Sequence, residues 1–129
     1  MRIILLLLLM MLTLSAGDAF GQNGGKAEPK EIKFASNSSS VTVAGTLISG
    51  REAHYFFKAQ KGQEVTIRSP RWNMFDFRVF SEENFPDGDF DSSPTYTFEI
   101  PETGDYKFFV RKKMASPRSA RFSMTITIK

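Results

Sequence analysis

The sequence contains no cysteine, which excludes disulfide bonds and thiolate chemistry. It also contains a single histidine, His54, and a single tryptophan, Trp72. A catalytic triad would have to use His54 as its base, and no Gly-x-Ser-x-Gly nucleophile motif accompanies that histidine. The sequence therefore predicts a protein that is not an enzyme, that needs no cofactor and whose fold depends on packing and hydrogen bonds.

Helical periodicity is missing as well. No segment repeats apolar residues every 3.6 positions over three turns, whereas about eight short segments alternate apolar and polar residues. The cleanest alternation runs over residues 122–128, where Phe122, Met124 and Ile126 are separated by polar residues. This pattern predicts an all-β fold, specifically a single antiparallel β-sandwich of about eight strands.

Only one long apolar run is present, and it lies at the N-terminus. It spans residues 3–12, follows Arg2 and precedes the small residues around Ala19 and Gly21. This order is typical of a secretory signal peptide, and the run is too short to cross a bilayer. We expect residues 1–21 to be cleaved after Ala19 or Gly21, no membrane span, and a bacterial periplasmic or secreted location.

The remaining chain has the length of one domain. Residues 22–40 are polar and predict a flexible lead-in with a short edge strand near residues 31–34, and residues 41–129 form the predicted β-sandwich domain. The whole sequence has 17 Lys and Arg against 14 Asp and Glu, a net charge of +3. A balance this mild does not indicate a nucleic-acid partner.

The stretch His54–Arg68, HYFFKAQKGQEVTIR, is the centre of the predicted fold. Apolar residues alternate with polar ones on both sides of the turn at residues 60–62, where Gly62 can adopt a positive φ. We expect two strands paired as a β-hairpin, with flanking strands supplying a second sheet.

An acidic segment, Asp87–Asp91, has the D-x-D-x-D spacing of a calcium-binding loop. Its sixth position is Ser92 instead of glycine, and its twelfth is Phe98 instead of the glutamate that closes such a loop. The sequence therefore predicts a solvated acidic turn and no metal site.

Charge is segregated along the second half of the chain. Five carboxylates lie within residues 82–91, and five basic residues lie within residues 111–121. Arginines on a loop between two firm strands can bind carboxylates bidentately, although a basic loop can also be a solubilising surface. Trp72 is open to two interpretations, an interface or sugar-stacking residue and a half-buried cap of the core.

The segments His54–Val65 (HYFFKAQKGQEV), Thr103–Tyr106 (TGDY) and Ile126–Lys129 (ITIK) resemble prepeptidase C-terminal-type β-sandwiches. Within that class the chain most resembles the bacterial periplasmic inhibitors of goose-type (g-type) lysozyme. The resemblance covers residues 41–129.

This resemblance implies that surface loops block the glycan-binding cleft of a lysozyme. Two loops match in position, Ser49–His54 and Lys112–Arg121. The first loop departs from the family, which tends to have tyrosines there, because residues 49–54 read Ser-Gly-Arg-Glu-Ala-His. The class of lysozyme that is bound therefore stays open, with g-type favoured. The implied lysozyme-binding residues are Ser49, Arg51, Glu52, Lys113, Arg118 and Arg121.

A second interpretation is a non-catalytic module that binds polysaccharide or matrix protein. In that case Trp72, Tyr96, Phe56 and Phe109 would form an aromatic platform for the glycan. The two interpretations differ in their partner, lysozyme in one and insoluble glycan in the other.

Overall fold

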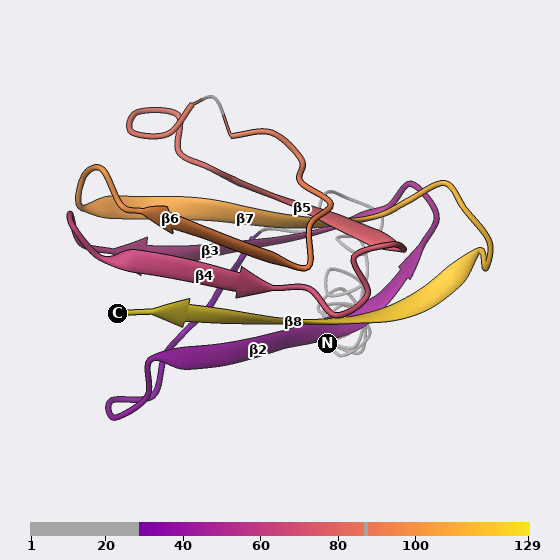
Figure 1. Cartoon of the computed structure of the whole chain (residues 1–129), viewed down its shortest axis with the longest axis horizontal. Coiled ribbons are helices and arrows are strands. Elements are labelled where there is room, and N and C mark those ends of the chain that lie inside the picture. Colours follow the sequence, from indigo (N-terminus) through magenta and orange to yellow (C-terminus); the bar gives the residue numbers. More distant parts are fainter. Residues whose placement is uncertain (1–28, 87) are drawn as a thin grey trace, which may run out of the picture.

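The computed structural model describes residues 29–86 and 88–129, and the predicted signal peptide and residues 22–28 of the lead-in lie outside this part. The described residues form strands and no helix, so no helix among them could span a membrane. Figure 1 shows the strands in sequence colours. Their bounds are β1 Lys30–Glu31, β2 Ser40–Ile48, β3 Glu52–Ala59, β4 Glu64–Arg68, β5 Phe75–Phe80, β6 Thr95–Glu99, β7 Gly104–Lys112 and β8 Ser119–Ile128.

The eight strands form two four-stranded sheets. Sheet A has the order β1-β3-β7-β5, and sheet B has the order β2-β8-β4-β6. Every pairing is antiparallel except that of β1, which runs parallel to β3. The predicted all-β class and strand number are confirmed, whereas the purely antiparallel arrangement is wrong, because the edge strand from the lead-in enters sheet A in the same direction as β3.

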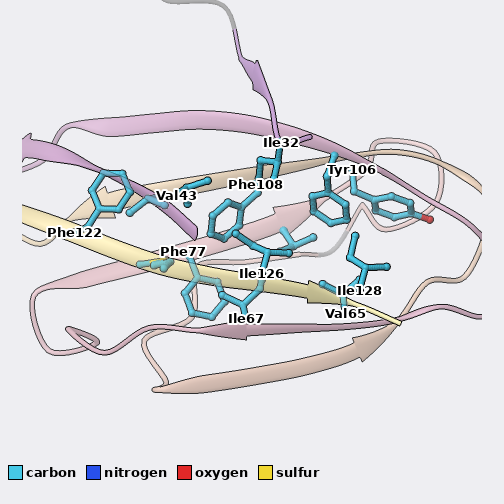
Figure 2. Packing of buried hydrophobic residues seen from close by; sticks show 14 of the residues in the cluster. Ile32, Val43, Val65, Ile67, Phe77, Tyr106, Phe108, Phe122, Ile126 and Ile128 are labelled. Carbon is cyan, nitrogen blue, oxygen red and sulfur yellow. The ribbon is translucent and has the colours of Figure 1, made fainter. Parts of the chain in front are cut away.

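One apolar core fills the space between the sheets. Figure 2 shows Phe108 of β7 on one side and Ile67 of β4 and Ile126 of β8 on the other, all pointing inward. The alternation expected over residues 122–128 is confirmed, since Phe122 and Ile126 are at most 1% exposed. Each large apolar side chain buried this way stabilises the fold by roughly 1.5–3 kcal/mol.

The predicted hairpin over His54–Arg68 is wrong. Its two strands, β3 and β4, do not pair, because β3 lies in sheet A and β4 lies in sheet B. Phe57 of β3 and Val65 of β4 are both fully buried. The two apolar faces bury each other only when the strands belong to opposite sheets, so the turn carries the chain across the core.

The β3–β4 turn is fixed by local geometry and by a neighbouring turn. The amide of Gln63 donates to the carbonyl of Gln60 at 3.1 Å, and Gly62 has a φ of 89°. The amide of Gly62 donates to the carbonyl of Ile100 at 2.9 Å, and the amide of Lys61 donates to the Thr103 hydroxyl at 3.0 Å. The turn is thereby tied to the β6–β7 connection.

We expect Gly62→Ala to lower the free energy of unfolding by about 1–2 kcal/mol, because an L-residue is strained at this positive φ. An alanine Cβ would meet no atom within 4 Å, so any loss would come from the backbone. Thermal unfolding monitored by circular dichroism checks this. Gly62→Asn is the matched control and should be milder, since asparagine tolerates positive φ. Equal stability of wild type and Gly62→Ala would contradict the expectation.

Candidate binding surface

Three loops meet at one end of the molecule, on the right in Figure 1. They are the β2–β3 turn (residues 49–51), the β4–β5 connection (69–74) and the β7–β8 loop (113–118), and we call this region the loop end. The amide of Gly50 donates to the carbonyl of Lys112 at 2.8 Å. The two loops predicted to act together are therefore in contact, and the structure adds the 69–74 connection.

Ser49 links the first loop to the β7–β8 loop. Its amide donates to the carbonyl of Arg118 at 2.7 Å, and its hydroxyl lies 3.3 Å from the carbonyl oxygens of Ala115 and Arg118. The Ser49 polar groups are thus engaged within the chain. The structure places this predicted residue where it holds the loop that carries Arg118.

Lys112 is fully buried at the base of the β7–β8 loop. Its ammonium group donates to the carbonyl oxygens of Lys113 at 3.0 Å and Ala115 at 2.8 Å. A buried ammonium group is costly unless hydrogen bonds compensate for lost water, and here the loop backbone supplies them. Lys112 therefore fixes the loop from inside and does not belong to its exposed charge.

Arg111 is also engaged within the chain. Its guanidinium donates to both carboxylate oxygens of Asp76, at 3.1 and 2.7 Å, and lies 3.7 Å from the ring centroid of Phe90. The hydrogen bond to Asp76 raises the pKa of Arg111 above its ordinary value. Arg111 and Lys112, two of the five basic residues in the predicted cluster, therefore have structural partners.

The remaining cations are presented to solvent. Arg51, Arg118 and Arg121 are exposed and Lys113 is half-buried. None of them takes part in an ion pair within 4.0 Å in the part of the chain that the structure describes. Arg121 lies at the start of β8 on the outer face of sheet B, and its carbonyl accepts a hydrogen bond of 2.7 Å from Arg71. The loop end therefore carries positive charge that its own side chains do not neutralise.

Glu52 has a side-chain partner of its own on β3. Its Oε1 lies 3.0 Å from Nε2 of His54, and in sheet A it stands opposite Arg111. The structure thus places this predicted residue on the outer face of sheet A, beside the loop end.

Exposed apolar side chains gather at the same end. Among the described residues the large hydrophobic side chains classed as exposed are Met114 at 82%, Trp72 at 47% and Ile48 at 45%. All three belong to or border the three loops. Trp72 is about half covered, and it is not among the side chains packed against the core. Sequence reasoning missed Met114 and Ile48, because a single apolar residue in a loop or at a strand end breaks no periodic pattern.

The described part of the acidic segment forms no metal cage. Asp87 lies outside the described part of the chain. The carboxylates of Asp89 and Asp91 accept hydrogen bonds from the amides of Phe90 and Ser93, at 2.7 and 2.8 Å. No group of three or more His, Asp or Glu side chains that could hold a metal ion occurs among the described residues.

We expect calcium to leave the thermal stability unchanged. The segment lacks the bidentate glutamate of a calcium loop, so the folded state gains no specific ligand set over the unfolded chain. The melting temperature should be the same within error in millimolar calcium and in excess chelator. An increase of several degrees in calcium, reversed by the chelator, would show that the metal interpretation was right.

The predicted aromatic platform does not form. Phe56 and Phe109 lie on the outer face of sheet A, but Tyr96 points inward, its ring 6.0 Å from that of the buried Phe77, and Trp72 lies at the loop end. The outer aromatics of sheet A are also partly covered, since the His54 ring stacks on Phe109 at 3.8 Å. The four residues therefore cannot contact one glycan together.

No model of a known protein family matches the sequence, and neither does any curated protein. Solved structures do match. A periplasmic inhibitor of g-type lysozyme from Salmonella Typhimurium, PliG, superposes with a TM-score of 0.66 at 21% identity, over 81% of this chain and 100% of its own. The chain has the PliG fold.

Two further solved structures are similar to this chain. PliG of Aeromonas hydrophila gives a TM-score of 0.64 at 22% identity, over 78% of this chain and 96% of its own. The pre-peptidase C-terminal domain of a Bacillus anthracis collagenase gives 0.54 at 15% identity, over 83% of this chain and 100% of its own. The likeness to both classes, predicted from the sequence, is confirmed at the level of the fold.

Proposed function

We propose that this chain is an exported inhibitor of lysozyme, with g-type lysozyme as its favoured target, and that the loop end blocks the glycan-binding cleft. The observation that carries the proposal is the match to PliG over the whole of that inhibitor's chain. The proposal includes a cleaved signal peptide at residues 1–21, a β-sandwich domain over residues 41–129, a periplasmic or secreted location, and neither enzymatic activity nor a cofactor.

The chemistry of the loop end suits such a target. A lysozyme cleft holds a catalytic carboxylate among polar groups that bind sugar. Arg118 and Arg121, with Arg51 from the neighbouring loop, would supply charge-assisted hydrogen bonds to such groups. Trp72 and Met114 would supply the apolar contacts that carry much of the binding energy in protein interfaces.

The loop end is also held in place before any partner binds. Ser49 and the buried Lys112 together hold the backbone of residues 113–118 through side-chain and backbone hydrogen bonds. A loop ordered in advance loses less conformational entropy on binding. Lys113, at the edge of this surface, would mainly raise the association rate through its charge.

A turbidity assay with bacterial cell walls tests the proposal. Purified mature protein is added to g-type, chicken-type and invertebrate-type lysozyme in turn. Lysis by g-type lysozyme should slow in proportion to the inhibitor added. If the protein inhibits only chicken-type or only invertebrate-type lysozyme, that lysozyme class is its target instead of g-type. Lack of inhibition together with co-sedimentation on insoluble glycan would favour the second interpretation, a polysaccharide-binding module. The collagenase domain, which is similar in fold to this chain, makes that interpretation the alternative to test.

A further inference from the structure

The two sheets have four edge strands, and three of them are protected. An edge strand offers unpaired N–H and C=O groups to any other strand unless it is short, covered, charged or bounded by proline. In sheet A, β1 has two residues, and β5 is covered where Asp91 pairs with Phe77. In sheet B, β6 has five residues, ends in Glu99 and lies between Pro94 and Pro101.

The fourth edge strand, β2, has none of these protections. It is nine residues long, Ser40–Ile48, with the sequence SVTVAGTLI. It contains no charged residue and no proline, and its valines and threonines favour extended structure. It pairs along its whole length with β8 and is the lowest strand in Figure 1.

The register with β8 shows which backbone groups of β2 are free. Ser39 stands opposite Ile128 in continuation of this register, and the amide of Ile128 donates to the carbonyl of Ser39 at 2.8 Å. Hydrogen-bonded pairs alternate in an antiparallel ladder, so the odd-numbered residues of β2 bond to β8. The N–H and C=O groups of Thr42, Ala44 and Thr46 therefore point away from β8, and no described residue bonds to them.

The apolar residues of this strand are also incompletely buried. Val41 and Leu47 pack against the core but stay half-buried, whereas Val43 between them is 9% exposed. Val41 and Leu47 face inward at an edge that no further strand covers. A strand added beside β2 would shield both side chains.

We propose that two copies of this chain associate through their β2 strands, paired antiparallel about a two-fold axis at Ala44. In this register Thr42 stands opposite Thr46 of the second copy, and each of the free residues donates one hydrogen bond and accepts one. Val41 stands opposite Leu47 of the second copy, so the exposed parts of the two cores meet. No charges oppose each other, because β2 has none.

The second copy fits this edge because β2 is self-complementary in that register, with threonine against threonine on the outer face and valine against leucine on the inner face. Sheet B of each copy contributes four strands to one continuous sheet. Since the paired strands run in opposite directions, the two loop ends point away from each other. The dimer thus leaves both loop ends accessible, and its formation does not depend on the proposed inhibition.

A charge-swap experiment tests both the dimer and its register. Ala44 is exposed and lies on the two-fold axis, so Ala44→Lys would place two lysines opposite each other, and Ala44→Glu two glutamates. Ser123 is the matched control, because it stands beside Ala44 on the same exposed face but one strand further from the edge. Sedimentation velocity of the mature protein over a range of concentrations measures self-association.

We expect the wild type and Ser123→Lys to form dimers with similar dissociation constants. Ala44→Lys and Ala44→Glu should each weaken dimerisation at least about fivefold, because like charges directly opposite each other destabilise a strand pair. An equal mixture of the two variants should regain dimers through lysine–glutamate pairs. A wild type that stays monomeric at all concentrations overturns the proposal, and so does a dimer that Ala44→Lys leaves intact.

Discussion

Replacing Arg118 and Arg121 together by alanine is expected to weaken inhibition of g-type lysozyme at least about tenfold, a loss of about 1.4 kcal/mol in binding free energy. Both side chains are exposed, and neither has a carboxylate partner within 4.0 Å in the described residues. Arginines that enter a carboxylate-containing cleft become desolvated and form charge-assisted hydrogen bonds, so their loss should mainly increase the dissociation rate.

The same double variant should unfold at nearly the wild-type temperature, because exposed side chains without partners rarely change stability by more than about 0.5 kcal/mol. Lys58→Ala with Lys61→Ala is the matched control, since it removes the same charge near the β3–β4 turn, at the opposite end of the molecule. Inhibition constants from the turbidity assay compare the two pairs. If the Arg118 and Arg121 variant inhibits as well as the wild type, the basic loop is only a solvated surface. The binding site would then have to be sought around Trp72.

Lys112→Ala is expected to be the most destabilising of these changes. Truncation of a fully buried long side chain leaves a cavity and costs roughly 2–5 kcal/mol. It also removes the donor to the carbonyl oxygens of Lys113 and Ala115. We expect a loss of about 3 kcal/mol, and hence a fall in melting temperature of more than about 10 °C for a domain of this size.

Lys112→Met separates packing from hydrogen bonding. Methionine keeps most of the buried stem and removes the cost of burying an ammonium group, so stability should largely return. The loop carbonyls still lose their donor, so inhibition should stay weaker than that of the wild type. Thermal unfolding and inhibition constants of the same samples decide this. Wild-type inhibition by Lys112→Met would mean that these hydrogen bonds do not position the loop.

The sequence pattern predicted strands better than it predicted their partners. Alternation is a property of one strand facing a core, which is why residues 122–128 and the number of strands could be foreseen. Pairing depends on where each apolar face meets another. The tight turn at Gly62 looks the same in a hairpin and in a crossing between sheets, and only the rest of the core shows that Phe57 and Val65 belong to opposite sheets.

The sequence predicted which two loops lie together but not how each side chain of the loop end is engaged. The two loops expected to meet do meet, because β2 precedes β3 and β7 precedes β8 at the same end of the molecule. A run of basic residues does not reveal that Lys112 points inward or that Arg111 binds Asp76, which lies 35 residues away. Likewise, Met114 becomes notable only when its 82% exposure is known.

The most direct test of the central claim is competition between this protein and a soluble chitooligosaccharide for g-type lysozyme. If the loop end occupies the glycan-binding cleft, the two ligands exclude each other. The apparent dissociation constant of the inhibitor should then rise linearly with oligosaccharide concentration. A dissociation constant that stays the same at saturating oligosaccharide, or no measurable binding to g-type lysozyme, would contradict the account.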